Sequence, residues 1–338
     1  MKILFKDFVE LHRGYDLPKR SRKNGTIPVI ASTGIIGSHN ISKVLGPGVI
    51  TGRSGSIGKV NYVKSNFWPL NTTLYVSDFK NNNPKYVYYR LQTLSLGKFA
   101  SGSAVPTLNR NDLSELEISI HEKEEQNKIV AKLEPFEKKI ELNNQINDNL
   151  ISLAIALFNK YFPNINSGNE MIGNFISNYD RLRKPLSKKE RLSIPGKYRY
   201  IGATSVNDYI NKYNFDGIYL LLGEDGTVED DNGYPILQYI SGKFWPNNHA
   251  HVLQGKNVST EWLYLFFKQR KITSIVTGAV QKKISQKNLN SLSISIPDKD
   301  KLARFDTIIN PIFKNIRIIE SENHSLEKIK VELLSKLF

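Results

Sequence analysis

The chain has 338 residues, 40% of them hydrophobic, and its 47 Lys and Arg outnumber its 32 Asp and Glu, giving a formal net charge of +15. This length allows two domains with separate cores. The absence of cysteine excludes disulfides and thiolate metal sites, and we see no signal peptide and no apolar run of membrane-spanning length, so we expect a cytoplasmic protein without a membrane partner.

Residues 1–120 combine short β-branched and aromatic segments with turns rich in Gly, Asn and Pro, which is typical of a mixed α/β domain. Leu116, Ile118 and Ile120 alternate as in a half-buried strand. We expect strands at residues 27–30, 49–51, 59–63, 73–76 and 114–120, and a helix at 84–96.

The hydrophobic period changes in residues 121–162 to steps of three and four, which predicts a long helix with a coiled-coil seam. Asn143 and Asn147 occupy two beats of that seam, and Pro135 is expected to start or kink the main helical segment. The apolar beats are Ile129, Leu133, Phe136, Ile140, Leu150, Leu153 and Leu157.

Residues 163–296 read as a second domain and residues 297–338 as a second helix. Pro311 occupies the place of Pro135, and Asn323 the place of Asn147. The expected seam of this helix is Phe305, Ile309, Ile312, Ile316, Ile319, Asn323, Leu326, Ile329 or Lys330, Leu333 and Leu337.

The chain repeats itself. Residues 100–162 align without a gap on residues 276–338, and 15 of the 63 positions are identical, including Gly102 with Gly278, so one domain-plus-helix unit is present twice. We therefore expect an α+β fold, in which two similar α/β domains are separated by two long antiparallel helices forming a coiled coil with pseudo-two-fold symmetry.

Looser matches extend the repeat into the domains, where residues 67–71 match 244–248 and 30–33 match 201–204. The turn Gly52-Arg53-Ser54-Gly55 matches Gly223-Glu224-Asp225-Gly226. The scaffold is kept while the residues on its turns differ, as expected of two modules that read different sequences.

Positive charge is concentrated in the two domains. Residues 1–120 carry 16 basic and 7 acidic residues (net +9) and residues 163–296 carry 17 and 11 (net +6), whereas the two helical segments come to −1 and +1. This favours domains that meet a polyanion and helices that meet protein. The alternative is a lysine-rich composition that serves only solubility.

No catalytic motif is present. The chain lacks the Asn/Asp-Pro-Pro-Tyr/Phe signature of adenine methyltransferases, and the glycine loop at residues 52–59 departs from a phosphate-binding loop at Arg53 and Val60. We interpret His249 and His251 as structural and the acidic turn Gly223–Gly226 as a solvated edge, so no metal site is expected.

In this order of parts, the chain resembles the specificity subunit of type I restriction–modification enzymes. The resemblance rests on the segments Ile27–Gly37, Gly52–Gly58, Gly223–Gly226 and Leu113–Ile120, the last followed by Glu124-Glu125-Gln126, and it covers essentially the full length. It implies a non-catalytic subunit in which each target-recognition domain reads one half of a bipartite site in double-stranded DNA.

The resemblance also implies partners. The helices would set the spacing of the half-sites and dock two modification methyltransferase subunits, and two restriction subunits can join to cleave DNA. S-adenosylmethionine, ATP and Mg would be held by those partner subunits, and this chain would bind no cofactor.

Two groups of residues are the candidates for these contacts. Exposed cations should bind phosphate, and Arg53 and Ser54 should read bases. The DNA-contact candidates are Lys19, Arg20, Arg22, Lys23, Arg53, Ser54, Arg181, Arg183, Lys184, Lys188, Lys189, Lys282 and Lys283. The helix-seam candidates are Ile140, Asn147, Leu150, Leu157, Ile316, Asn323, Leu326 and Leu333.

Two alternatives remain at this level. A stand-alone two-domain DNA-binding regulator would act without methyltransferase partners, and a nuclease with an unrecognised site would cut DNA as the pure chain in the presence of a metal. Methylation by a partner complex distinguishes the specificity subunit from the regulator.

Overall fold

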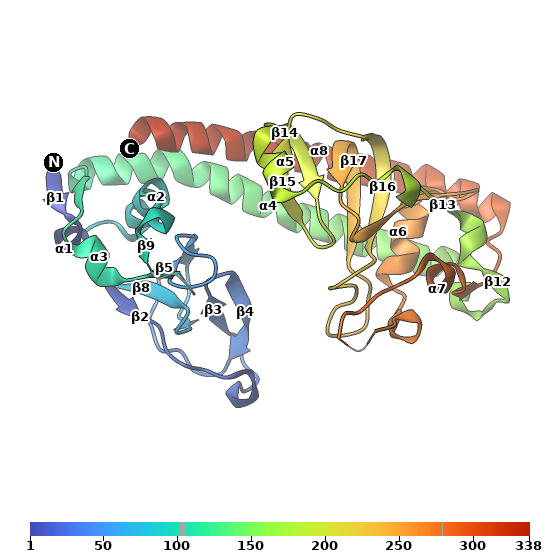
Figure 1. Ribbon diagram of the computed structural model, residues 1–338, viewed down its shortest axis with the longest axis horizontal. Coiled ribbons are helices and arrows are strands. Elements are labelled where there is room, and N and C mark those ends of the chain that lie inside the picture. Colours follow the sequence, from blue (N-terminus) through green and yellow to red (C-terminus); the bar gives the residue numbers. More distant parts are fainter. Residues whose placement is uncertain (102–105, 279) are drawn as a thin grey trace. The chain divides into compact units, whose positions relative to one another are not determined.

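The computed structural model describes residues 1–101, 106–278 and 280–338 (Figure 1), so Gly102 of the repeat lies outside the described residues. The chain forms two compact units. Unit 1 comprises Met1–Leu142 and Asn323–Phe338, and unit 2 comprises Asn143–Glu322. Each unit therefore holds one mixed α/β domain and about half of each long helix.

The two long helices confirm the repeat. Helix α4 spans Lys123–Tyr161 and helix α8 spans Lys299–Leu337, each with 39 residues. Their first residues (299 minus 123) and their last residues (337 minus 161) are both 176 positions apart. Among the described helices, none combines the length and the apolar character needed to cross a membrane.

Of the two expected roles of Pro135 and Pro311, that of starting the helices is wrong, because both lie inside them, and that of kinking them stays a prediction. Each proline removes one amide donor, which leaves the carbonyl of the residue four positions earlier without its helical partner. Both prolines are exposed, so that side of the helix faces water, which can satisfy the carbonyl.

The domain of unit 1 is built on two sheets. The larger is antiparallel, in the order β2-β8-β5-β6, and the smaller has the order β4-β3-β7, with β3 and β7 parallel. Strand β1 pairs with β11 and brings the two ends of the domain together. The elements are β1 (Lys2–Leu4), α1 (Phe5–Phe8), β2 (Glu10–Arg13), η1 (Lys19–Ser21), β3 (Ile27–Ala31), β4 (Gly34–His39), β5 (Gly48–Gly52), β6 (Val60–Val63), β7 (Trp68–Pro69), β8 (Thr73–Asp78), α2 (Pro84–Thr93), η2 (Leu96–Phe99), β9 (Ala100–Ser101), β10 (Thr107–Leu108), α3 (Arg110–Ser114) and β11 (Glu117–Ser119).

The domain of unit 2 has one six-stranded sheet in the order β13-β18-β16-β17-β14-β15. All neighbours are antiparallel except β14 and β17, and β12 pairs separately with β19. The elements are η3 (Ile165–Ser167), β12 (Glu170–Met171), η4 (Ile172–Phe175), β13 (Ile176–Asn178), η5 (Asp180–Leu182), α5 (Lys188–Ser193), β14 (Pro195–Ile201), β15 (Val206–Ile210), β16 (Phe215–Gly223), β17 (Leu237–Pro246), β18 (Ala250–Gly255), α6 (Thr260–Lys268), η6 (Thr273–Ile275), α7 (Gln286–Asn290) and β19 (Ser293–Ile294).

Strand registers show that the two domains share one framework. Ile30 lies opposite Pro69 on β7, and Ile201 lies opposite Pro246 on β17, both in parallel pairs. This confirms the looser repeat found in the sequence. The single strand β17 covers the places of both β6 and β7, which joins the two sheets of the first plan into one.

In each unit the two helix halves run antiparallel around the domain core. Leu133 of α4 shares the core of unit 1 with Leu334 near the end of α8. In unit 2 the end of α4 meets the start of α8, because the ring of Phe162, just after α4, lies 5.1 Å from the ring of Phe305 near the start of α8. The short helix α2, capped by Asn83 with Pro84 in its first turn, packs its buried tyrosines into the same core as α4. The ribbon of α2 lies beside that of α4 (Figure 1).

The seam of α4 follows the prediction as far as Asn147 and then shifts by one residue. Asn143 is buried and donates to Glu322 at 2.7 Å, and Leu150 and Leu157 contact the core of unit 2. Leu153, predicted in the seam, is 48% exposed, whereas Ala154 and Phe158 are buried. A straight helix drifts from a seven-residue repeat by about 20° per heptad, which brings the following residue onto the packed face.

On α8, Ile316 is buried, whereas its counterpart Ile140 on α4 is half-buried. Asn323, Leu326 and Leu333 are half-buried like their counterparts Asn147, Leu150 and Leu157. The sequence left the beat at Ile329 or Lys330 open. Ile329 is 44% exposed, and the Lys330 side chain is covered and pairs with Glu327 at 2.8 Å, so Lys330 takes this position.

The shifted seam can be tested with two truncations. Phe158→Ala should lower the free energy of unfolding by about 3–5 kcal/mol, because it leaves a large cavity in the core of unit 2. Leu153→Ala, five residues earlier on the same helix, should change it by less than about 0.5 kcal/mol. Urea unfolding followed by circular dichroism measures both, and equal losses would contradict the shift.

Candidate nucleic-acid interface

The two glycine turns singled out in the sequence occupy equivalent places. Arg53 follows the last residue of β5, and its amide donates to the carbonyl of Thr72 at 2.9 Å. Glu224 follows Gly223, the last residue of β16, and its amide donates to the carbonyl of His249, also at 2.9 Å. Since Thr72 and His249 are themselves equivalent by sequence offset, the turns match in their backbone contacts.

The next residues of the turns also match. Ser54 bridges to Thr107 and Asp225 bridges to Lys283, and these two partners are 176 positions apart. Gly55 and Gly226 both have positive φ values, +79° and +86°, which a residue with a Cβ would adopt only with strain. The framework therefore presents Arg53 and Ser54 in one unit where it presents Glu224 and Asp225 in the other.

In unit 2 this place is filled by a buried network of charged groups. Arg183 donates to Glu224 at 2.6 Å, and His251 contacts Asp180 at 2.6 Å. The exposed fractions of the four side chains are 12%, 15%, 0% and 5% in that order. The turn itself is as predicted, but Glu224 is covered and does not form the solvated edge that we expected.

Asp180 is the acceptor at the centre of this network. Burial raises the pKa of this carboxyl, but hydrogen bonds from His251, the amide of Val252 and Asn178 outweigh it and lower the pKa to about 2. The other ring nitrogen of His251 lies 2.9 Å from the carbonyl oxygen of Ile284. Both ring nitrogens of His251 thus contact oxygen acceptors inside the domain.

The ligand atoms of Asp180, Glu224 and His251 lie within 4.8 Å of one another, a spacing that a metal ion could bridge. Here the guanidinium of Arg183 already balances the carboxylates, and it also donates to the carbonyl of Ala250 at 2.6 Å. The prediction of Arg183 as a DNA contact therefore needs correction, because its donors are committed inside the domain. The sequence alone does not show this network of Arg183 with the two carboxylates, because Asp180 and Glu224 lie far apart along the chain.

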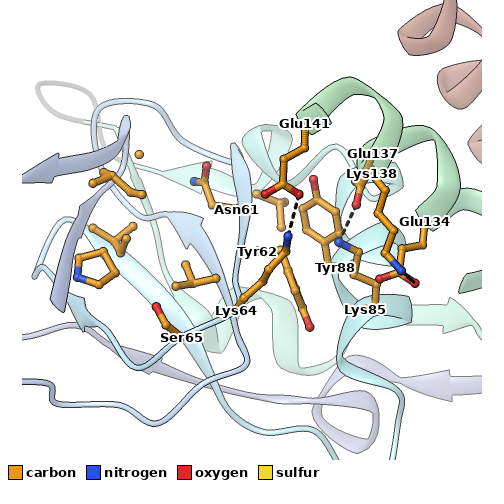
Figure 2. A pocket seen from close by; sticks show the side chains of 16 residues that line it. Asn61, Tyr62, Lys64, Ser65, Lys85, Tyr88, Glu134, Glu137, Lys138 and Glu141 are labelled. Atoms are coloured by element: carbon orange, nitrogen blue, oxygen red, sulfur yellow. Dashed lines mark hydrogen bonds and ion pairs between the residues drawn. The ribbon is translucent and has the colours of Figure 1, made fainter. Parts of the chain in front are cut away.

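Two ion pairs beside a cavity fix the domain of unit 1 to its long helix. A cavity of about 500 Å³ lies between β6, the β3–β4 hairpin and α4 (Figure 2). On its walls Lys85 pairs with Glu137 at 2.5 Å, and Lys64 pairs with Glu141 at 2.7 Å. The Lys85 ammonium also lies 4.2 Å from the centre of the Tyr62 ring, and its side chain is only 12% exposed.

Unit 2 has a similar contact with the charges exchanged, and its helix residue stands at the place of Glu141, one turn after that of Glu137. Glu261 on α6 stands 176 positions after Lys85, and it accepts from Arg317 of α8 at 3.2 Å. Tyr239, equivalent to Tyr62, donates to Glu261 at 2.6 Å. In unit 1 the domain thus contributes the cation and the long helix the anion, whereas in unit 2 the domain contributes the anion and the long helix the cation. We call these two contacts the domain seats.

The remaining DNA-contact candidates lie on the surface, except Arg22, Arg53 and Ser54, which are half-buried. Arg22 donates to the carbonyl of Ile36, and the exposed Lys282 pairs with Glu229 at 2.7 Å, so its charge is balanced. Lys283 lies 3.8 Å from Glu224 but is 53% exposed. The exposed candidates are Lys19, Arg20, Lys23, Arg181, Lys184, Lys188, Lys189, Lys282 and Lys283.

Comparison with known proteins agrees with this repeated architecture. The model of the type I restriction modification DNA specificity domain matches residues 2–151 and 176–331, which together are most of the chain. The chain belongs to this family. Each match holds one domain and most of the helix that follows it, so the internal repeat is two copies of the specificity domain.

Relatives show the extent of the likeness. The MjaIX specificity subunit of Methanocaldococcus jannaschii is 24% identical over 330 residues, covering 83% of this chain and 74% of that protein. A Haemophilus influenzae protein named as the type I restriction enzyme specificity subunit S.HindORF215P is 33% identical over 127 residues. That alignment spans 37% of this chain and 31% of the Haemophilus protein.

The crystal structure of the type I restriction–modification S subunit from M. genitalium has the same fold, with a TM-score of 0.55 and 19% identity. The alignment covers 100% of this chain and 96% of that one. The specificity-subunit fold thus extends over the whole chain.

The buried network predicts a dependence on pH. Because the folded pKa of Asp180 lies below its ordinary value of 3.8, its ionisation stabilises the fold above that pH by about 2–3 kcal/mol. This stability should be lost as the pH falls toward 2. Asp180→Asn should lower the free energy of unfolding at pH 7 by at least this amount, and the difference from the native chain should shrink in urea titrations at pH 2.5.

The partly exposed pair of Arg191 with Asp208, in the same domain, supplies the control. Asp208→Asn should cost no more than about 1 kcal/mol. A loss for Asp180→Asn that is equally small at pH 7 would contradict a central role for the buried carboxylate.

The domain seat of unit 1 can be tested by charge exchange. Lys85→Glu should cost about 3 kcal/mol or more, because it buries two carboxylates side by side. Adding Glu137→Lys should recover more than half of that loss. Lys128→Glu, at the exposed end of α4, should cost less than about 1 kcal/mol. Thermal and urea unfolding measure these chains and Glu137→Lys alone, and additive losses in the double variant would exclude the pairing.

Proposed function

We propose that this chain is the DNA-specificity subunit of a type I restriction–modification complex and is itself non-catalytic. Each domain reads one half of a bipartite site in duplex DNA. The two long helices set the distance between the halves and dock two methyltransferase subunits, in some complexes with two restriction subunits. The complex would act in the cytoplasm, with S-adenosylmethionine, ATP and Mg bound by the partners.

The observation that carries this proposal is the pair of equivalent turns. One backbone framework carries Arg53 and Ser54 in unit 1 and Glu224 and Asp225 in unit 2, and because Arg183 covers Glu224, it is the exposed surface around each turn that differs between the copies. Side chains that read different bases must differ, whereas the strands that position them need not. Two copies of a common scaffold with different turn residues are what a split, non-repeated recognition sequence requires.

The distribution of charge supports the same division of labour. Both domains carry a positive excess and present exposed cations, which suits phosphate contacts. The helical segments are nearly neutral, with a net charge of −1 and +1, and α4 presents exposed apolar side chains such as Leu142 and Leu153. Such a surface suits protein partners better than DNA.

Mapping of methylated adenines tests the proposal. The chain is expressed with the methyltransferase encoded beside it, in a host free of other methylation, and genomic DNA is sequenced for methyladenine. We expect one split motif. Replacing residues 1–120 with those of a relative should change one half of the motif and leave the other half and the spacer as they were.

Replacing residues 163–296 is the matched control, and it should change the other half only. A folded complex of chain and methyltransferase that methylates no motif would contradict the proposal and favour a stand-alone DNA-binding regulator. Metal-dependent cutting of DNA by the pure chain would favour a nuclease.

A further inference from the structure

We propose that unit 1 contains a cavity that binds a phosphate of the DNA backbone through Arg13, Arg53 and Arg110. The cavity has a volume of about 410 Å³, and no carboxylate of the described residues lines it. This inference rests on the proposed function and adds to it a phosphate site in one domain. It also reassigns Arg53 from base reading to phosphate binding.

The three arginines reach the cavity from separate elements. Arg13 ends β2, Arg53 stands on the glycine turn after β5, and Arg110 begins α3. Arg53 contacts the carbonyl of Asn71 at 3.4 Å, and Arg110 donates to the carbonyl of Leu11 at 3.2 Å. Among the described residues no carboxylate pairs with any of the three arginines, so their positive charges share one cavity without an anion.

Unit 2 shows what the same framework does when its charges are balanced from within. Arg53 corresponds to Glu224, and Arg110 corresponds to Gln286, the first residue of α7, 176 positions later. Arg13 pairs with Leu74 on β8, and Leu74 corresponds to His251, the residue that Asp180 contacts. Hence Asp180, Glu224 and Gln286 stand where unit 1 has three arginines.

The two sites differ in how their charge is met. In unit 2, Arg183 supplies a cation beside Asp180 and Glu224, His251 contacts Asp180 at 2.6 Å, and Gln286 donates to Asp180 at 2.6 Å. The cavity of unit 1 holds three cations and no internal counterion among the described residues. One guanidinium group can donate two parallel hydrogen bonds to the oxygens of a phosphate. A bound phosphate would therefore supply the negative charge and the hydrogen-bond acceptors that the site lacks.

A backbone phosphate fits this site better than a base does. Three positive charges favour an anion, and DNA bases are neutral. The cavity also borders Thr107, which bridges to Ser54 on the turn, so a phosphate held here would lie beside the residue proposed to read bases. Contacts to phosphate fix the register of a protein on DNA without adding sequence information.

The test uses the complex of the full chain with its methyltransferase and a duplex carrying the mapped motif. Arg13→Gln and Arg110→Gln, singly and together, are compared with the native chain by fluorescence anisotropy over a range of NaCl concentrations. Each loss of a phosphate contact should reduce the slope of log K against log salt by about 0.9. Affinity should fall about tenfold, and the methylated motif should stay the same.

Two further variants sharpen the result. Lys2→Gln removes one charge from an exposed pair with Glu117 in the same domain and should leave the slope unchanged. Arg110→Lys keeps the charge and should retain most of the slope, which separates loss of charge from disturbed folding. Each variant is checked by its melting temperature before its binding is interpreted.

The outcomes distinguish the two proposals. Unchanged slopes for Arg13→Gln and Arg110→Gln in a complex that still binds its motif would overturn the phosphate site and leave the proposed function intact. A relaxed base preference at the first half-site in Arg53→Gln would also overturn it, since the cavity would then read bases. A native complex with no affinity for the duplex would overturn the proposed function itself.

Discussion

The structure depends on the contact that fixes each domain to its long helix. In unit 1 this is the covered pair of Lys85 with Glu137 beneath the Tyr62 ring, and in unit 2 it is Glu261 with Arg317 beside Tyr239. A recognition surface is useful only if its distance and orientation from the rest of the assembly are constant. A covered ion pair has few alternative geometries, because moving either partner leaves a desolvated charge behind.

Around this contact the chain uses one backbone framework for two electrostatic solutions. The turns after β5 and β16 have the same amide and carbonyl partners, and the helices α3 and α7 begin at equivalent residues. In unit 2 the charged groups at this place satisfy one another through Arg183 and His251. In unit 1 the corresponding residues are arginines that face an open cavity. Local chemistry has diverged while the hydrogen-bond ladder that carries it has been kept.

Much of this architecture could be predicted from the sequence, because a constant offset constrains both copies at once. The helix bounds, the strands at residues 27–30 and 73–76 and the equivalence of the turns all follow from aligned positions. Side-chain partners could not be predicted. The sequence suggests that Arg183 is an exposed cation, because its partner Glu224 lies 41 residues away along the chain. Arg13 and Arg110 are also far apart in sequence and come to line one cavity only in the folded domain. The sequence pattern places Leu153 in the seam because a seven-residue repeat takes no account of the slow rotation of the packed face along a straight helix.

The exchanged charges of the two domain seats bear on how such a chain can evolve. Recombination between the two halves of the gene could place the first domain on the second helix. Lys85 would then face Arg317, and in the reciprocal product Glu261 would face Glu137. Like charges would meet at a covered contact in both products. The charges therefore disfavour exchanging the two domains within one chain, and a domain brought in at its own position must carry a cation at the place of Lys85 or an anion at the place of Glu261.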